Sequence, residues 1–295
     1  MRPAAPAALL HERVLAWFDA HGRDLPWRAP DTSPWGVFVS EVMSHQTPVA
    51  RVEPVWREWM RRWPTPSGLA AEPPGEVVRA WGRLGYPRRA LRLREAAVAM
   101  VERHGGEVPD DEDALRTLPG VGAYTAAAVA AFAYQRRTTV VDTNVRRVLA
   151  RVVRGHALAS PALTADESRL AASLVPTEAA EAARWNVAVM ELGALVCRAR
   201  GPRCRECPVE DLCAWVGAGS PPDDGPPRRG QAWHGTDRQV RGRVLQALRD
   251  VEGPLPRPRL EALADDATQV DRCLASLVED GLLEPLPSDR FALPS

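Results

Sequence analysis

Apolar residues recur every three or four positions along most of the first 215 residues, which is the spacing of one face of an α-helix. Between 48 and 63, for example, Val52, Trp56, Trp59 and Trp63 share such a face. No strand-like alternation competes with this pattern. The pattern therefore predicts an all-α region, with helices over 9–20, from Pro34 through 43, and over 48–63, 76–83, 88–103, 111–117, 123–133, 143–153, 165–174 and 179–195.

The pattern changes after residue 217, where proline and glycine become frequent, and this composition is typical of a linker. Beyond it, 239–250, 258–264 and 267–280 again show helical spacing, and 282–286 and 290–293 predict a short hairpin. Three helices followed by a hairpin are typical of a winged-helix module. We therefore expect a main domain over 1–217, a linker over 218–236 and a small winged-helix-like domain over 237–295.

Composition supports a folded chain, because 45% of its 295 residues are hydrophobic. No apolar run is long enough to cross a bilayer, and the first ten residues show no cleavable signal pattern. We therefore expect a cytoplasmic protein with no membrane contact. All 38 basic residues are arginine, so a mechanism that needs a lysine Schiff base is excluded.

A glycine-containing turn, Leu118-Pro119-Gly120-Val121-Gly122, separates two predicted helices. Pro119 and Gly120 would end the first helix, and Gly122 would let the chain approach another backbone closely before the second helix begins. The free N–H groups at that helix start suit a phosphate oxygen without reading any base. An ordinary corner between two helices is the alternative.

Four cysteines lie within 17 residues, with the spacing Cys197-x6-Cys204-x2-Cys207-x5-Cys213. In an intracellular protein such a group indicates metal ligation rather than disulfides. Structural zinc usually takes two close pairs, whereas only the middle pair is close here, so the spacing favours a four-iron, four-sulfur (4Fe–4S) cluster over zinc. Arg203 and Arg205 lie on this loop, which could press them against phosphates.

Two acidic residues stand in apolar surroundings, Glu41 beside Phe38 and Val42, and Asp142 after Val140-Val141. A buried carboxylate is costly without a partner or a task. Breaking a glycosidic bond requires one group that protonates the leaving base and one that balances the cationic sugar, and paired carboxylates meet both needs. A helix cap or a buried ion pair would explain either residue alone, and Asp142-Thr143-Asn144 is itself a plausible helix start.

Taken together and in this order, the motifs resemble the helix-hairpin-helix DNA glycosylases of the endonuclease-III superfamily, and within it the MutY-type adenine glycosylases. The resemblance covers residues 10–215. It rests on Leu25-Pro26-Trp27-Arg28, Val39-Ser40-Glu41-Val42-Met43 with Gln46-Thr47, Leu84-Gly85-Tyr86, residues 118–125, Val141-Asp142-Thr143-Asn144-Val145, Glu191-Leu192-Gly193-Ala194-Leu195-Val196-Cys197 and the cysteine loop.

The resemblance implies a six-helix barrel domain plus an iron–sulfur cluster domain, with Cys197, Cys204, Cys207 and Cys213 as ligands of a 4Fe–4S cluster. It assigns Glu41 as the general acid and Asp142 as the stabiliser of the sugar cation, supported by Tyr124 and Asn144. Contacts to DNA are assigned to Arg28, Gln46, Thr47, Tyr86, Gly120, Gly122, Arg203 and Arg205.

Tyr124 stands where bifunctional relatives carry the lysine that attacks the sugar, so hydrolysis by water is expected. The resemblance thus implies a monomeric, monofunctional glycosylase of base excision repair. Its substrate would be double-stranded DNA with adenine opposite 8-oxoguanine or guanine. The alternatives are a sister glycosylase for another mispaired or damaged base, and a non-catalytic DNA-binding module with a structural metal.

Some positions depart from the family pattern. Relatives usually have Leu-Gln where this chain has Ser44-His45, often an aromatic where it has Pro87, and Glu or Gln where it has Val187. Many also carry a C-terminal domain related to nucleotide pyrophosphohydrolases, and the segment after residue 235 is too short for that domain.

Overall fold

The computed structural model describes residues 7–223, 225 and 233–295, so part of the predicted linker, residues 224 and 226–232, lies outside the described residues. The prediction of a mainly helical fold is confirmed, with 59% of the chain in helices. Backbone contacts divide the chain into two units: residues 1–37, 110–116 and 121–226 form unit 1, and residues 38–109, 117–120 and 227–295 form unit 2. Within the described residues, no helix is both long and apolar enough to span a membrane.

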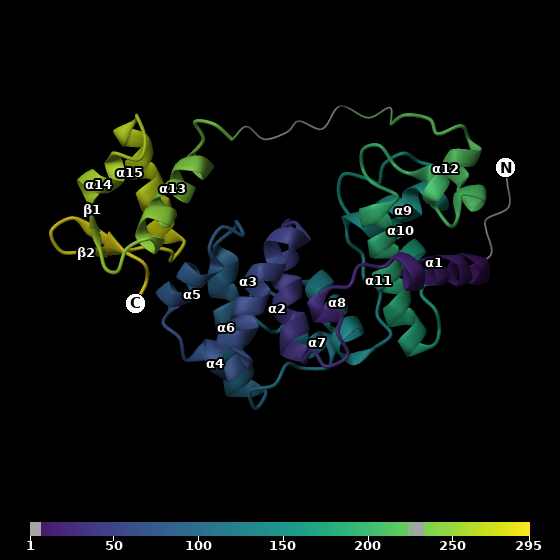
Figure 1. Ribbon diagram of the computed structural model, residues 1–295, viewed down its shortest axis with the longest axis horizontal. Coiled ribbons are helices and arrows are strands. Elements are labelled where there is room, and N and C mark those ends of the chain that lie inside the picture. Colours follow the sequence, from purple (N-terminus) through teal and green to yellow (C-terminus); the bar gives the residue numbers. More distant parts are fainter. Residues whose placement is uncertain (1–6, 224, 226–232) are drawn as a thin grey trace. The chain divides into compact units, whose positions relative to one another are not determined.

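Unit 1 contains the N-terminal helix and most helices after residue 110 (Figure 1). Helix α11 packs against α1, α8 and α9, and its apolar residues join a core that includes Trp17, Leu149, Trp185 and Leu192. The elements are α1 (Ala7–His21), η1 (Pro26–Arg28), α7 (Glu112–Arg116), α8 (Ala123–Tyr134), α9 (Thr143–Val152), α10 (Ala165–Ser173), α11 (Ala179–Leu195), η2 (Cys204–Glu206), η3 (Glu210–Leu212) and α12 (Ala214–Gly217).

Helix starts in unit 1 follow from capping residues in the sequence. The Asp142 side chain accepts a hydrogen bond from the N–H of Val145 and so begins α9. The Thr164 side chain accepts from the N–H of Glu167, whose carboxylate returns to the backbone of Thr164, and this capping box begins α10. These caps satisfy N–H groups that have no partner inside the helix.

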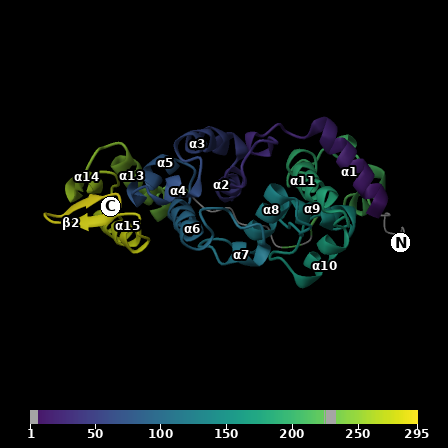
Figure 2. The same cartoon turned by 90° about the horizontal axis from the view of Figure 1, so that it is seen from below.

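In unit 2, a tryptophan-rich core joins the helices between α2 and α6 (Figures 1 and 2). Trp59 makes edge-to-face contacts with Trp63 and Trp81, at ring-centroid distances of 4.8 and 5.6 Å. Trp59 also donates from its indole N–H to the carbonyl of Ala80. The helices are α2 (Pro34–Ser44), which starts in unit 1, α3 (Val49–Arg62), α4 (Pro66–Ala70), α5 (Pro74–Trp81) and α6 (Arg88–Arg103).

The C-terminal segment of unit 2 has the predicted three helices and hairpin, and it adds a third strand. Strand β3 is central in the antiparallel order β1-β3-β2, with Leu255 opposite Phe291 and Pro285 also opposite Phe291. The elements are α13 (Asp237–Arg249), β1 (Leu255–Pro256), α14 (Arg257–Glu261), α15 (Ala267–Glu279), β2 (Glu284–Leu286) and β3 (Arg290–Ala292). Strand β1 has two residues, too few for a sequence pattern to show.

This C-terminal segment shares a core with the rest of unit 2. Val78 of α5 is fully buried among Val244, Leu274 and other residues of the C-terminal helices. Two arginines fasten the ends of α5 and α13 to each other, because Arg79 donates to the carbonyls of Leu248, Arg249 and Val251, and Arg249 donates to that of Val78. Each arginine thereby satisfies carbonyl groups that a helix C-terminus leaves open.

Some predicted boundaries differ from the structure. The helix expected over 76–83 begins at Pro74, since proline suits the first turn, and it ends at Trp81 because Gly82 takes φ 55°. The short helices α4 and α12 were not predicted, because four or five residues are too few to display a helical period.

Candidate active site and cysteine loop

The Asp142 carboxyl group lies at the start of α9 and is held on both oxygens. Its Oδ1 accepts from the N–H of Val145 at 2.7 Å, and its Oδ2 accepts from Nδ2 of Asn144 at 2.7 Å. Asn144 in turn accepts from Nη2 of Arg147 at 2.7 Å. The structure therefore brings together Asp142 and Asn144, two of the residues that the family resemblance assigned to catalysis.

Arg147 connects this carboxyl group to the start of the cysteine loop. Its guanidinium also donates to the carbonyls of Gly193 and Cys197, each at 2.7 Å. Gly193 itself is required by packing, since a Cβ there would come within 2.6 Å of Cβ of Asn144. Helices α9 and α11 thus meet at van der Waals distance beside the candidate catalytic group.

Burial raises the pKa of Asp142, while its hydrogen bonds to Val145 and Asn144 and the charge of Arg147 pull it back down. The raised pKa thus occurs at Asp142, the residue that the family resemblance assigns to balancing a cation. A positive charge arriving beside the carboxyl group would favour its ionised form and relieve the cost of burial.

Glu41 lies on α2 and has only 9% of its surface exposed. Its neighbours along the helix are Phe38, Val42 and Met43, which are all buried, so the predicted apolar setting of this carboxyl group is confirmed. Glu41 belongs to unit 2 and Asp142 to unit 1.

The two glycines of the hairpin, Gly120 and Gly122, differ in backbone conformation and in the space around them. Gly120 takes φ 76°, and a Cβ there would come within 2.8 Å of the side chain of Arg92. Gly122 has φ −94° as the N-cap of α8, and a Cβ there would meet no described atom within 4 Å. Among the described residues, no part of the protein approaches Gly122 closely, so its predicted approach to another backbone stays a prediction.

Tyr124 stands in the first turn of α8 and packs, partly buried, against Ala127, Ala128 and Val140. Seven of the twelve residues of this helix are alanine, and seven of its residues are buried. Small side chains let α8 pack closely on its neighbours and fix the start of the helix, where Tyr124 lies.

Arg28 is bound to an acidic residue that the sequence analysis treated only as part of a motif. Its Nη2 donates to Glu191 at 2.9 Å, and Nη1 donates to the carbonyl of Arg23. Arg23 meets the same carboxylate through Nε at 2.5 Å and Nη2 at 2.9 Å. The signal that could have revealed this ion pair was a glutamate between the apolar residues Met190 and Leu192 near the end of helix α11.

Glu191 should make folding depend on pH. Burial raises its pKa, but the hydrogen bonds and charges of Arg23 and Arg28 outweigh burial and lower it from 4.5 to about 2. A lowered carboxyl pKa adds stability above pH 4.5, which is lost as the pH falls towards 2. The shift corresponds to roughly 3 kcal/mol at neutral pH. In urea unfolding at pH 7, the free energy of unfolding of Glu191→Gln should be lower than that of the parent by this amount. At pH 3 the difference between the two proteins should be smaller by about 2 kcal/mol. A deficit equal at both pH values would contradict this role.

Two loops of unit 2 carry the residues assigned to the base stack. Gln46 and Tyr86 are exposed and take left-handed φ angles of 53° and 48°. Between the loops, the Thr47 hydroxyl donates to the carbonyl of Leu84 at 3.1 Å. The structure therefore brings the Gln46-Thr47 and Tyr86 segments together, a proximity that the sequence did not predict.

His45, one of the departures from the family pattern, is held neutral. Burial, and then the charge of Arg89, lower its pKa from 6.5 to about 4. As the pH falls, His45 is protonated at a higher pH in the unfolded chain than in the folded one, which favours unfolding. The folded protein therefore has its full stability above pH 6.5 and loses stability as the pH falls to 4. When the pH falls from 7 to 5, the free energy of unfolding in urea should therefore decrease by about 2 kcal/mol less in His45→Gln than in the parent. Parallel losses in the two proteins would contradict a buried neutral imidazole.

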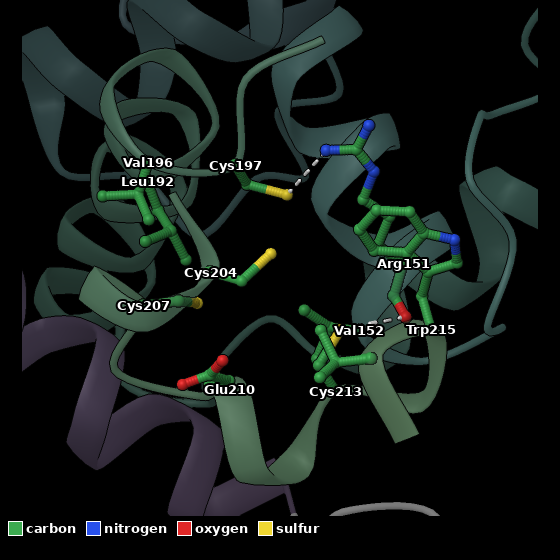
Figure 3. A pocket seen from close by; sticks show the side chains of 11 residues that line it. Arg151, Val152, Leu192, Val196, Cys197, Cys204, Cys207, Glu210, Cys213 and Trp215 are labelled. Carbon is green, nitrogen blue, oxygen red and sulfur yellow. Dashed lines mark hydrogen bonds between the residues drawn. The ribbon is translucent and has the colours of Figure 1, made fainter. Parts of the chain in front are cut away.

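The four clustered cysteines line one pocket with apolar walls formed by Val152, Leu192, Val196 and Trp215. Figure 3 shows the sulfur atoms of Cys197, Cys204 and Cys207 directed into it. Arg151 lies at its edge, with Nη1 3.5 Å from Sγ of Cys197. Among the described residues no three His, Cys, Asp or Glu side chains are gathered closely enough for a metal-ion site. The sulfurs share a pocket without converging on one ion.

Burial, together with the charges of neighbouring thiolates, raises the pKa of Cys207 to about 12, against the lowering effect of a hydrogen bond from the backbone of Val209. The pKa values of Cys204 and Cys213 are also raised, first by burial. Four thiolates here would therefore need a compensating positive charge. Outside the pocket, Arg203, which precedes η2, and Arg205 on η2 are exposed to solvent.

Comparison with known proteins agrees with this geometry. Residues 39–172 match the family described as "HhH-GPD superfamily base excision DNA repair protein". The chain is 54% identical over 291 residues to the adenine DNA glycosylase of Mycobacterium tuberculosis, a match that covers 98% of this chain and 95% of that protein. It is 42% identical over 221 residues to the human adenine DNA glycosylase, which covers 72% of this chain and 40% of that protein.

Among solved structures, a thermostable thymine-DNA glycosylase aligns with a TM-score of 0.63 and 25% identity, covering 72% of this chain and 97% of its own. An endonuclease III–DNA complex aligns with a TM-score of 0.61 at 23% identity, which shows the fold alone. The match to the mycobacterial enzyme extends through the C-terminal segment, whereas the others cover under three quarters of the chain. From the motifs, the helical fold and these relatives we conclude that the chain belongs to the adenine DNA glycosylases of the HhH-GPD superfamily of base excision DNA repair proteins.

Proposed function

We propose that this protein is a monofunctional DNA glycosylase that hydrolyses the N-glycosidic bond of adenine mispaired with 8-oxoguanine or guanine. The observation that carries the proposal is the Asp142 carboxyl group, buried at the start of α9 and held by Val145 and Asn144. A desolvated carboxyl fixed on both oxygens can stabilise a sugar cation with little reorganisation. The name shared by its relatives supports adenine as the base.

In this proposal Glu41, whose carboxyl group lies in an apolar setting, is the general acid that protonates the departing adenine. Asp142 balances the positive charge on the sugar until water adds to it. Asn144 and Tyr124 keep these groups and the extruded nucleotide in place. No lysine exists to form a Schiff base with the sugar, so the product is an abasic site in an uncut strand.

Double-stranded DNA with an adenine mispair is the proposed partner. The N–H groups at Gly122 and the turn at Gly120 would hold a phosphate, and the exposed Arg203 and Arg205 would hold others. Gln46, Thr47 and Tyr86 would enter the base stack. Arg28, fixed by Glu191, would contact the nucleotide with its remaining N–H groups. We propose that the protein acts as a cytoplasmic monomer.

We further propose that Cys197, Cys204, Cys207 and Cys213 bind a 4Fe–4S cluster. Their common pocket supports this, because each cysteine attaches to a different corner of a cube and the sulfurs need not meet at one ion. Such a cluster would supply the positive charge that four buried thiolates require and would cross-link residues 197–213. Iron and acid-labile sulfide in the purified protein, with no zinc, are the expected result, whereas one zinc per chain would refute the cluster.

A panel of duplexes tests the substrate. The thymine-DNA glycosylase of Aeropyrum pernix is 33% identical over 209 residues, so thymine opposite guanine is the second candidate. We expect base release from adenine opposite 8-oxoguanine or guanine and none from thymine opposite guanine. Strand breaks should appear only after alkali. Release of thymine alone would favour the second candidate, and breaks without alkali would contradict monofunctional hydrolysis.

A further inference from the structure

Arg89 connects the two loops of unit 2 that present Gln46 and Tyr86. Its Nη1 donates to the carbonyls of Val42 at 2.8 Å, Met43 at 3.2 Å and His45 at 2.7 Å. Its Nη2 donates to Oγ1 of Thr47 at 3.0 Å and to the carbonyl of Gly85 at 3.1 Å. One guanidinium therefore holds the end of α2, the loop after it and the loop before α6.

Both loops need such a support, because each contains a residue in an unfavourable backbone conformation. Gln46 and Tyr86 are not glycine, yet they have φ angles of 53° and 48°. Left-handed conformations of such residues persist only where surrounding contacts impose them. The contacts of Arg89 fall on the residues beside them, His45 and Thr47 around Gln46, and Gly85 before Tyr86.

The guanidinium also touches the aromatic residues of the second loop. Its Cζ lies 5.5 Å from the ring centroid of Tyr86 and 5.2 Å from that of Trp81, within the range of cation–π contacts. Trp81 donates from its indole N–H to the carbonyl of Gly85, which Arg89 also binds. Tyr86 nevertheless remains 52% exposed, so its side chain is supported from one side and open on the other.

The burial of the Arg89 guanidinium is energetically unfavourable in itself. Burial lowers the pKa of Arg89 to about 10, which still leaves the guanidinium charged at neutral pH. Its Nε is buried and has no hydrogen-bond partner among the described residues. A buried charge with an unsatisfied N–H is unfavourable unless its other contacts compensate. The five hydrogen bonds to the end of α2 and to the two loops are that compensation.

We propose that Arg89 is a positioning residue that holds Gln46 and Tyr86 together as one preorganised wedge for extruding the target nucleotide. The inference rests on the proposed function, in which both side chains enter the base stack. A wedge that is already ordered loses little conformational freedom when it enters DNA, so more of the contact energy drives extrusion.

Two variants of Arg89 and one control test this inference. Arg89→Met removes every hydrogen bond to the loops, and Arg89→Lys keeps the charge but cannot reproduce the planar fork that reaches both loops at once. Arg88→Met is the matched control, since Arg88 is the neighbouring residue on α6 and pairs with Asp280 instead. The control removes the same charge next to the same loops.

The measurement compares single-turnover excision of adenine opposite 8-oxoguanine with excision of adenine opposite an abasic-site analogue, where extrusion needs less help. Arg89→Met should slow the first reaction about 10-fold or more relative to the second, and Arg89→Lys should show a smaller effect in the same direction. Fluorescence of 2-aminopurine at the target position should show slower extrusion in both variants. Arg88→Met should leave the ratio of the two rates unchanged.

Equal slowing on both substrates, or an unchanged 2-aminopurine signal, would overturn the inference and leave Arg89 a purely structural residue. If Arg89→Met fails to fold, Arg89→Lys decides the question by the same ratio. Failure of the proposed function has a different result, because the parent protein would then release adenine from neither duplex.

Discussion

Replacing Glu41 by glutamine is expected to slow adenine release about 100- to 10,000-fold, the usual contribution of a positioned general acid. Glutamine has nearly the same shape as glutamate but has no acidic proton to give the base. Only 9% of Glu41 is exposed, so we expect solvent to be a poor substitute for it as the proton donor. The measurement is single-turnover release of adenine from a duplex with 8-oxoguanine opposite, with enzyme in excess.

Binding separates this loss from a general defect. Glu41→Gln should bind the same duplex as tightly as the parent, since the change removes no proposed DNA contact. Glu53→Gln is a suitable control, because Glu53 on α3 is also glutamate in unit 2 but pairs only with Arg57 at the surface. A Glu41→Gln variant that releases adenine within about threefold of the parent rate would remove Glu41 from the proposed mechanism.

Replacing Asp142 by asparagine should slow adenine release about 100- to 1,000-fold, the range found when an electrostatic stabiliser of a transition state is removed. The substitution suits this position because asparagine is as good an N-cap as aspartate. The N–H of Val145 therefore keeps its partner and α9 keeps its start. What disappears is the negative charge that would balance the sugar cation, together with the acceptor for Nδ2 of Asn144.

Asp266→Asn is the matched control for this experiment. Asp266 is also an N-cap, accepting from the N–H of Thr268 at the start of α15 in the C-terminal segment. Asp266→Asn should release adenine at the parent rate. Asp266→Asn and Asp142→Asn should both have unfolding temperatures close to that of the parent. Equal rates for Asp142→Asn and the parent would mean that Asp142 is only a helix cap, the alternative that the sequence left open.

Much of the fold could be predicted because its helices carry their own local signals. Apolar spacing predicted α3 and α6, and Pro34 and Asp142 marked the starts of α2 and α9. The strand β1 and the helices α4 and α12 escaped prediction because they depend on tertiary contacts rather than on a repeated pattern. The placement of residues 227–295 with residues 38–109 also depends on long-range packing, such as that of Val78, which no local pattern reveals.

The candidate site could be predicted in its residue types but not in its connections. The apolar neighbours of Glu41 and the capping position of Asp142 follow from sequence alone. The contact of Arg28 with Glu191, 163 positions apart, does not, and neither does the connection of Arg147 to Cys197. The role of Arg89 was not predicted either. Its main partners are backbone carbonyls, which every residue has, so the sequence gives no signal for these contacts.

The reciprocal arrangement of Arg79 and Arg249 has a practical consequence for shortened versions of this protein. Removing residues 237–295 would leave Val78 without its cover and its carbonyl, at the end of α5, without Arg249. It would also leave the guanidinium of Arg79 without the carbonyls of the C-terminal segment that it binds. A newly exposed apolar surface of this kind favours aggregation. Poor yield or low activity of such a truncation would then reflect the loss of packing contacts for α5. It would not show whether the removed segment recognises the lesion.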